Sequence, residues 1–308
     1  MPCGAGDANT LNKGRFGQQA PSHGNEMTLF KENFRAAKSL TLPFVLAAAV
    51  ALSLSGCRGV GAKEAKYVER PVEEIYNLGL KELQDGRYFQ AAEQFDEVER
   101  QHPYSVWARR SMLMAAYANY QINEYDKAIL AAQRFISLHP GNRDVAYAYY
   151  LVAVSYYEQI SDVGRDQKMT AEALRTLTEV VRRFPTSDYA RDARLKIDLT
   201  NDHLAGKEME IGRYYLKQNE YLAAINRFRV VVEVFQTTTH VPEALHRLTE
   251  CYVALGIIDE AQSAAAVLGH NYPGSDWYQD SYSLLTGRDV RPAENRKSWI
   301  SRAFSGIS

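Results

Sequence analysis

The chain has 308 residues and nearly balanced charge, with 36 Lys and Arg against 37 Asp and Glu and a formal net charge of −1. The chain therefore lacks the excess of basic residues that is typical of nucleic-acid-binding domains, and we expect no nucleic acid among its partners. The three cysteines are too few for the disulfide framework of a small secreted domain. Cys251 lies between helix-periodic leucines, and we expect it to be a buried apolar residue.

An apolar run near the N-terminus, from Leu40 to Leu54, leads directly into Ser55, Gly56 and Cys57. Basic residues precede the run, as in a secretory signal; they are Lys31, Arg35 and Lys38. A transmembrane helix needs about 20 apolar residues, so a permanent membrane span is the weaker alternative. An ordinary signal with an accidental cysteine is another. The pattern predicts a bacterial lipoprotein signal.

Cleavage at this signal would make Cys57 the first residue of the mature chain. Its sulfur would carry a diacylglycerol and its α-amine an N-acyl chain, and no other cofactor is expected. Several acyl chains hold a protein stably on a bilayer where one holds it marginally, at about 0.8 kcal/mol per buried CH₂. Arg58 follows Cys57, in place of the Asp that commonly retains lipoproteins in the inner membrane. We therefore expect the mature chain to be anchored on the periplasmic face of the outer membrane.

The signal divides the N-terminal part of the chain into segments. Residues 1–56 are an N-terminal extension and signal peptide, which we exclude from fold reasoning. Residues 27–56 form the expected true signal, because Met27 stands directly ahead of its basic residues. Residues 57–70 are a short polar, lipid-carrying tether.

The rest of the chain repeats one helical hairpin five times. The second helix of each hairpin carries a small residue followed by positions four, seven and twelve residues later, of which the last is Pro in four of the five. Spacings of four and three keep one face of a helix, and a small residue on the first helix faces this ladder. Small residues where two helices cross are the signature of the tetratricopeptide repeat (TPR). The ladders are Ala91-Phe95-Val98-Pro103, Ala128-Ala132-Phe135-Pro140, Ala173-Leu177-Val180-Pro185, Ala224-Phe228-Val231-Gln236 and Ala261-Ala265-Leu268-Pro273.

These repeats predict an all-α TPR solenoid of about five hairpins, in two parts. Residues 71–185 hold repeats 1–3. Residues 186–285 hold a linking helix over 187–217, with Ser187 or Asp188 capping its start, then repeats 4–5 and a capping helix over 276–285. Residues 286–308 are expected to form a flexible basic tail.

Side chains of the first helix of each repeat that are not used within the hairpin should line the concave wall of the solenoid. Tyrosine dominates this set in repeats 1–3, and it offers an apolar ring with a polar tip, the usual make-up of a peptide-binding surface. For any one ring, burial between repeats is an equally good alternative. The predicted groove residues are Tyr76, Arg110, Tyr117, Tyr120, Tyr147, Tyr150 and Tyr157.

Repeats 4 and 5 present a mixed, charged wall that includes Arg213, Glu243, His246 and Glu250, which suggests a second, different partner. His246 and Glu250 are four residues apart on one helix face and could contact a metal. No third ligand accompanies them, so a solvated pair is the better interpretation. The chain has no zinc-protease, nucleophile-elbow, P-loop or paired-Cys motif. We predict neither catalytic residues nor a metal, and a binding scaffold rather than an enzyme.

Lipoprotein signal and repeats together resemble the BamD family (also called ComL-like), TPR lipoproteins of the β-barrel assembly (BAM) machinery. The resemblance covers residues 57–285 and is most specific at 76–79, at 102–105 (His-Pro-Tyr-Ser), at 184–193 (Phe-Pro-Thr-Ser-Asp-Tyr-Ala-Arg-Asp-Ala) and at 204–215. It implies a non-catalytic subunit on the periplasmic face of the outer membrane. Only Cys57 carries over sharply as a site residue.

The resemblance also implies partners. C-terminal repeats of the family dock on the periplasmic POTRA domains of the barrel protein BamA, beside other BAM lipoproteins. N-terminal repeats are proposed to capture the C-terminal targeting signal of unfolded outer-membrane proteins, an extended strand ending in an aromatic residue. The alternative function is a TPR lipoprotein adaptor for periplasmic cell-wall hydrolases or division proteins.

Overall fold

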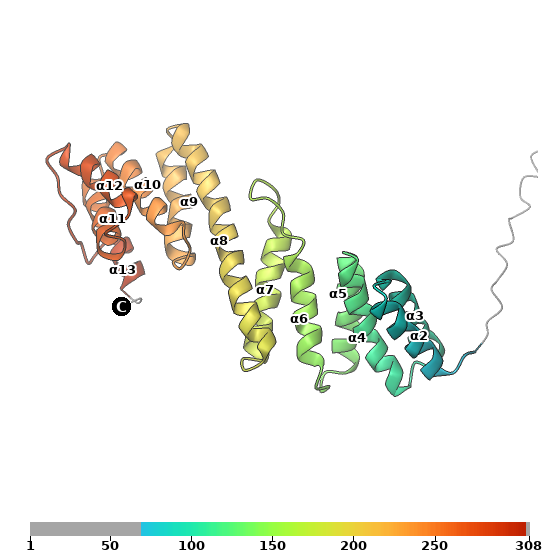
Figure 1. Cartoon of the computed structure of the whole chain (residues 1–308). Helices are drawn as coiled ribbons and strands as arrows, with labels where there is room; N and C mark the ends of the chain where they lie inside the picture. Colours follow the sequence, from blue (N-terminus) through green and yellow to red (C-terminus); the bar gives the residue numbers. More distant parts are fainter. Residues whose placement is uncertain (1–68, 306–308) are drawn as a thin grey trace, which may run out of the picture. The chain divides into compact units, whose positions relative to one another are not determined.

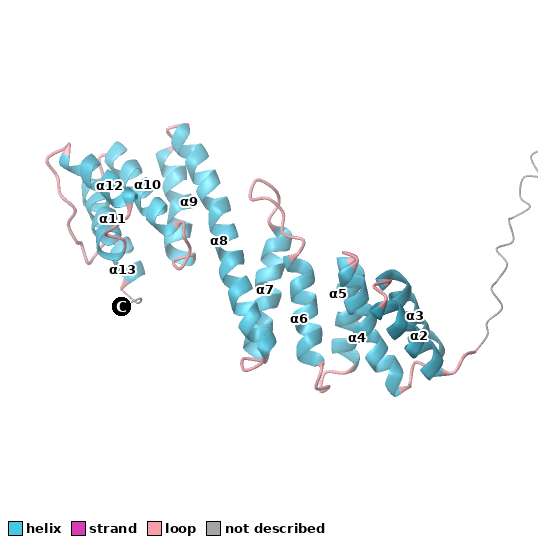
Figure 2. Cartoon of the chain, in the orientation of Figure 1, coloured by secondary structure: helices cyan, strands magenta, loops and turns pink. Residues whose placement is uncertain are grey.

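A computed structural model describes residues 69–305 of the chain, and within them every regular element is a helix (Figures 1 and 2). Consecutive helices from α2 to α11 pair into five antiparallel hairpins, each with a first helix (even number) and a second helix (odd number). In chain order the helices are α2 (Val72–Gln84), α3 (Tyr88–Gln101), α4 (Val106–Gln121), α5 (Tyr125–Leu138), α6 (Val145–Tyr157), α7 (Lys168–Arg183), α8 (Asp188–Lys217), α9 (Tyr221–Val234), α10 (Val241–Ala254), α11 (Ile258–Asn271), α12 (Asp276–Thr286) and α13 (Trp299–Phe304). The predicted all-α TPR fold is confirmed.

The helical ladder of each repeat forms its core. The first three positions of all five ladders are buried, from Ala91, Phe95 and Val98 in α3 to Ala261 and Leu268 in α11. Each first helix also packs on the second helix of the preceding hairpin, as α4 does on α3 and α10 on α9. One hairpin therefore buries only one side of its apolar surface by itself, and the stack of hairpins buries the other.

The size of the residue on the first helix matches that of the ladder residue it meets. Gly79 stands against the ring of Phe95, where an added Cβ would lie 2.8 Å from Cε1, and Gly212 stands against Phe228, where the distance would be 2.4 Å. In the second repeat, Ala116 occupies the equivalent position and the ladder residue is a small alanine. A glycine thus stands opposite each phenylalanine and an alanine opposite an alanine, so the two residues at the crossing fill the core together.

The turn inside four of the hairpins has a residue in the left-handed region. Gly86 and Gly256 have φ values of 74° and 75°, and Asn123 and Asn219 both have 61°. Glycine and asparagine adopt this conformation at least cost. In two turns the tyrosine that opens the second helix also donates its hydroxyl to the asparagine, as Tyr125 does to Asn123 at 2.8 Å.

The helix predicted over 187–217 is observed as α8, with 30 residues. The Ser187 hydroxyl accepts a hydrogen bond from the backbone N–H of Ala190 at 3.1 Å and caps its start, as predicted. The first half of α8 packs on α6 and α7 and its second half on α9. The loop that precedes α7 contacts the middle of α8, where Lys207 Nζ donates to the backbone carbonyl of Gly164 at 3.3 Å. One helix therefore belongs to both groups of repeats.

The capping helix predicted over 276–285 is present as α12, but the prediction of a flexible tail over 286–308 is wrong for the described residues up to 305. Helix α13 packs on α11 and α9, and Ile300 is fully buried. The Trp299 indole N–H donates to the Tyr252 hydroxyl at 3.0 Å. The Arg229 guanidinium stacks on the Trp299 ring, 4.6 Å from its centre. The segment therefore covers the last repeat and closes its core.

The expected signal, Cys57 and the tether up to residue 68 lie outside the described residues. Within residues 69–305, even the longest helix lacks the run of apolar side chains needed to cross a bilayer.

Replacing Gly212 with Ala tests the close crossing of α8 and α9. Overpacking a core costs about 1–3 kcal/mol, against a gain in helix propensity of about 1 kcal/mol. We expect Gly212→Ala to lower the urea midpoint of unfolding followed by circular dichroism. Gly274→Ala is the control, because a Cβ there has no neighbour within 4 Å. Equal midpoints for Gly212→Ala and the native chain would contradict this account of the crossing.

Candidate partner-binding surfaces

Five of the predicted groove tyrosines lie on two neighbouring first helices. Tyr117 and Tyr120 are one helical turn apart on α4, and Tyr147, Tyr150 and Tyr157 follow one face of α6. The two helices are in contact, and all five side chains are half-buried. Rings that are half-buried keep one part packed while the other part stays available to a ligand.

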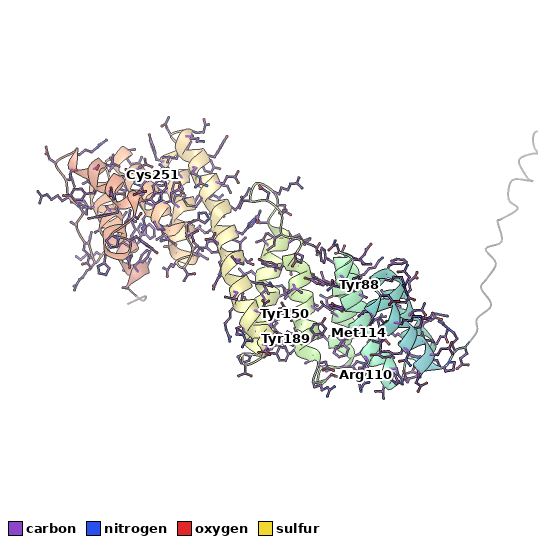
Figure 3. The ribbon with its side chains drawn as sticks, in the orientation of Figure 1. Tyr88, Arg110, Met114, Tyr150, Tyr189 and Cys251 are labelled. Atoms are coloured by element: carbon purple, nitrogen blue, oxygen red, sulfur yellow. The ribbon has the colours of Figure 1, made fainter. Side chains whose placement is uncertain are left out.

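A sixth ring, from α8, completes this group. Tyr189 lies with its ring centre 5.2 Å from that of Tyr150 and 5.6 Å from that of Tyr147, and Figure 3 shows Tyr150 and Tyr189 side by side. Tilted rings at this distance attract each other by about 0.5–1.5 kcal/mol beyond the area they bury. We refer to Tyr117, Tyr120, Tyr147, Tyr150, Tyr157 and Tyr189 as the tyrosine surface.

Polar side chains hold the hydroxyl ends of these rings. The Tyr150 hydroxyl donates to Asp192 Oδ2 at 2.6 Å, and the Tyr120 hydroxyl donates to Glu158 Oε1 at 3.3 Å. Lys196 Nζ lies 4.9 Å from the centre of the Tyr157 ring and 3.5 Å from Asp192. The tyrosine surface thus has an apolar floor and polar groups of both signs at its edge.

Three hydroxyls on this surface, those of Tyr120, Tyr147 and Tyr150, have a raised pKa and stay protonated well above neutral pH. Burial raises the pKa of Tyr147, with smaller effects from neighbouring tyrosines. Burial, followed by the hydrogen bond to Asp192, raises the pKa of Tyr150. Burial and the negative charge of Glu158 raise the pKa of Tyr120 to about 12. Each of these three hydroxyls is therefore neutral and keeps its proton for hydrogen bonding.

Two other predicted groove residues lie apart from this group. Tyr76 was expected on the wall but is only 8% exposed, because its ring packs against Trp107 at 4.7 Å and Phe95 at 5.6 Å. It is a core residue between the first two repeats, and the prediction for it is wrong. Arg110 is exposed and lies 5.7 Å from the centre of the Trp107 ring.

Tyr189, Asp192 and Lys196 were missed in the sequence. Projecting the repeat register onto the long helix would have identified them, since spacings of three and four place them on one face. The prediction took the first part of that helix only as a link, which hid its contribution to the surface.

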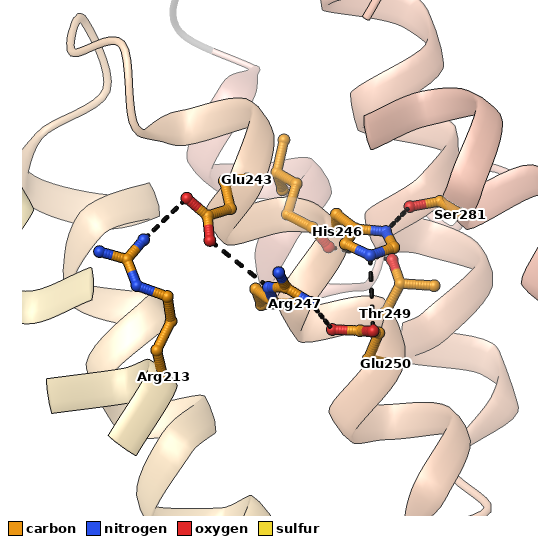
Figure 4. A network of polar contacts seen from close by, with 8 residues as sticks. Arg213, Glu243, His246, Arg247, Thr249, Glu250 and Ser281 are labelled. Atoms are coloured by element: carbon orange, nitrogen blue, oxygen red, sulfur yellow. Dashed lines mark hydrogen bonds and ion pairs between the residues drawn. The ribbon is translucent and has the colours of Figure 1, made fainter. Parts of the chain in front are cut away.

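The predicted charged residues of repeats 4 and 5 form a continuous polar network (Figure 4). Arg213 Nη1 of α8 donates to Glu243 Oε2 of α10 at 2.8 Å. Arg247 bridges the two carboxylates of α10, with Nε 3.4 Å from Glu243 Oε1 and Nη1 2.7 Å from Glu250 Oε2. His246 Nε2 lies 3.5 Å from Glu250 Oε1.

His246 faces the interior rather than a partner. It is 6% exposed, and its Nδ1 lies 2.8 Å from the Ser281 hydroxyl of α12. The Trp277 ring of α12 covers both the imidazole, with 5.3 Å between ring centres, and the Arg247 guanidinium at 5.2 Å. The expectation that His246 docks a partner is therefore wrong: this residue fastens α12 to α10. Arg213 and Glu250 keep partly exposed side chains.

The electrostatics of Glu250 follow from these contacts. Burial alone would raise the pKa of Glu250, but hydrogen bonds from His246 and Arg247 outweigh it, and the pKa lies below its ordinary value.

Within residues 69–305, no three potential metal ligands come together. The arrangement is suited to joining helices.

Comparison with known proteins places this chain among outer-membrane assembly proteins. A family described as outer membrane lipoprotein (YfiO) matches residues 68–268. The outer membrane protein assembly factor BamD of Caulobacter vibrioides is 53% identical over 84% of this chain and 85% of its own length. The protein of the same name from Rickettsia prowazekii is 46% identical over 77% of this chain and 93% of its own length.

Among solved structures, a thermophilic TPR protein from Thermus thermophilus matches 70% of this chain and 100% of its own, at 19% identity and a TM-score of 0.33. Helices α12 and α13 lie beyond residues 68–268, which the family model matches.

Removing the Ser281 hydroxyl tests the attachment of α12. Ser281→Ala leaves His246 Nδ1 buried without its partner, and such a loss costs about 1–3 kcal/mol. We expect a lower urea midpoint than for the native chain. Ser283→Ala removes an exposed hydroxyl of the same helix and should leave the midpoint unchanged. Equal effects of the two substitutions would argue against the role of the network.

Acid titration of stability tests the lowered pKa of Glu250. Because its pKa is lower in the folded state, ionised Glu250 stabilises the fold above the ordinary carboxyl pKa. That stabilisation is lost as the pH falls through the folded-state value. We expect Glu250→Gln to lower stability near neutral pH and to flatten its decline under acid. Glu233→Gln, at an exposed ion pair on α9, is the control. A native-like acid profile for Glu250→Gln would contradict the assignment.

Proposed function

The chain belongs to the BamD family of outer-membrane protein assembly factors, and from this premise we propose that it is a lipid-anchored scaffold that binds two kinds of protein. The tyrosine surface receives segments of unfolded outer-membrane proteins, and the C-terminal repeats bind a BamA-like barrel protein through its POTRA domains. Other lipoproteins of the assembly complex are further partners. The tyrosine surface is the observation that carries this proposal.

The targeting signal of an unfolded barrel protein is an extended strand that ends in an aromatic residue, and the chemistry of the tyrosine surface suits it. Half-buried rings on α4, α6 and α8 offer faces on which an aromatic side chain packs. The neutral Tyr147 hydroxyl donates to a carbonyl group that an extended strand leaves unpaired. The hydroxyls of Tyr120 and Tyr150 already donate to Glu158 and Asp192, so they accept from the N–H groups of the strand. Lys196, at the edge of the surface, supplies positive charge for a terminal carboxylate. Binding of this kind is weak enough for the strand to be passed on.

The barrel-protein partner is assigned to repeats 4 and 5 because their composition differs from that of the tyrosine surface. The polar network fixes α8, α10 and α12 to one another, so these repeats present a rigid face. Partly exposed Arg213 and Glu250 lie at its edge, and arginine anchors within polar rims are frequent in protein interfaces.

A lipid on Cys57 would confine both surfaces to the membrane. Tethering turns a second binding event into an intramolecular one and raises the effective concentration of the partner. The adaptor alternative, for cell-wall hydrolases or division proteins, uses the same anchor and fold. The relatives named as assembly factors do not favour it.

Peptide binding tests the role of the tyrosine surface. We expect Tyr117→Ala combined with Tyr150→Ala to weaken binding of a fluorescent peptide that carries the C-terminal strand of a barrel protein by about ten- to a hundredfold. Each aromatic contact is worth about 0.5–1.5 kcal/mol beyond the area it buries, and the double variant removes two rings. Fluorescence polarisation measures the affinity. Replacing the terminal aromatic residue of the peptide should weaken binding to the native chain as well.

Tyr214→Ala is the matched control, because Tyr214 is an exposed tyrosine of α8 outside the tyrosine surface. Circular dichroism verifies that each variant is folded. Unchanged affinity in the double variant would refute the proposed role of the surface and leave the fold and family unaffected.

A further inference from the structure

The chain enters the repeats at a fixed point, the corner between α3 and α4. The backbone N–H of Arg70 donates to Gln101 Oε1 at 2.9 Å, and the backbone carbonyl of Arg70 lies 2.8 Å from His102 Nε2. Arg70 Nη2 also donates to Gln94 of α3 at 3.2 Å. The segment that leads to Cys57 therefore leaves the folded unit at this corner.

The same corner exposes apolar side chains. Tyr104 is 101% exposed and Val106 58% exposed, and both follow His102 within four residues. Ser105 between them caps α4, accepting from the backbone N–H of Ala108 at 3.0 Å, which fixes the backbone that carries them. A fully exposed aromatic ring on an ordered corner has no role in the core of this chain.

The next corner continues this edge. Antiparallel hairpins place the connections α3–α4, α5–α6 and α7–α8 on one side of the stack, and Figure 2 shows these loops along one edge of repeats 1–3. Leu138, at the end of α5, is 58% exposed, and the exposed Arg143 side chain lies in the loop that follows.

We infer that this edge, formed by residues 102–106 and 138–143, rests on the lipid headgroups of the membrane that carries the anchor. The inference rests on the proposed lipid at Cys57. Arg70 is thirteen residue steps along the chain from Cys57, so the corner can lie at most about 45 Å from the lipid attachment point.

A lipid surface accounts for these side chains better than a protein partner does. Tyr rings favour the membrane–water interface, where the ring is partly buried and the hydroxyl stays wet. The exposed Arg143 side chain, whose Nε lies 3.4 Å from Asp144 Oδ1, supplies positive charge for lipid phosphates. The contact is weak alone, and the short tether makes it persistent by keeping the edge close to the bilayer. It also orients the first helices with their starts toward the membrane.

A probe at Tyr104 tests the inference. The Tyr104→Cys chain, expressed from Met27 with its signal so that Cys3 is absent, is purified in its lipidated form and labelled with an environment-sensitive maleimide. Lipidated Cys57 does not react, and Cys251 is fully buried, with burial raising the pKa of its thiol to about 12. The protein is placed in vesicles of phosphatidylethanolamine and phosphatidylglycerol that contain a headgroup-region nitroxide lipid.

The matched control is Phe89→Cys, an exposed position of the same repeat near the start of α3, on the opposite edge. We expect the nitroxide lipid to quench the probe at residue 104 strongly and the probe at residue 89 weakly. Equal quenching at the two positions would overturn the inference. So would a response at residue 104 that appears only when a barrel protein is reconstituted with the chain, since that result assigns the edge to a protein partner.

The anchor is tested separately. Mass spectrometry of the purified chain and flotation with the vesicles report lipid on Cys57. Flotation without preferential quenching at residue 104 refutes the membrane-facing edge alone. Absence of lipid refutes the anchor and, with it, the reach argument on which the edge depends.

Discussion

The close crossing of the two helices in each hairpin is the constraint on which the rest of the structure depends. Where the second ladder position, at the crossing, is a phenylalanine, the first helix has room only for a glycine, as at Gly79 with Phe95 and Gly212 with Phe228. A fixed crossing sets the angle and distance of each hairpin, and through them the position of the next. Because each hairpin leaves one apolar side uncovered, stability and partner-binding surfaces both arise from stacking.

Stacking brings together side chains that are distant in sequence. Tyr117, Tyr150 and Tyr189 come from three repeats, yet they lie on one surface because the first helices are neighbours. Helix α8 links this surface to the charged network, since Tyr189 and Asp192 lie near its start and Arg213 near its end. At about 1.5 Å per residue, its 30 residues extend about 45 Å. One rigid element therefore carries side chains of both the tyrosine surface and the charged network and keeps the two at a fixed separation.

Much of the fold was predictable because its determinants are local. Ladder spacing, the cap at Ser187 and the turn residues are all set within one or two helices. The errors concern contacts between elements that no local pattern encodes. Tyr76 is buried by Trp107 of the next repeat, and His246 by Trp277 and Ser281 of the capping helix. The C-terminal segment resembled a polar tail, because its few apolar residues, including Trp299 and Ile300, have no helical period over a long stretch.

The central claim is that this chain is a subunit of the outer-membrane assembly machinery that binds a barrel protein. Affinity purification of the tagged, lipidated chain from detergent-solubilised outer membranes, with mass spectrometry of the proteins that co-purify, tests it most directly. The account predicts a barrel protein with POTRA domains in near-equal molar yield. Recovery of cell-wall hydrolases or division proteins without that barrel protein would contradict the claim and favour the adaptor alternative.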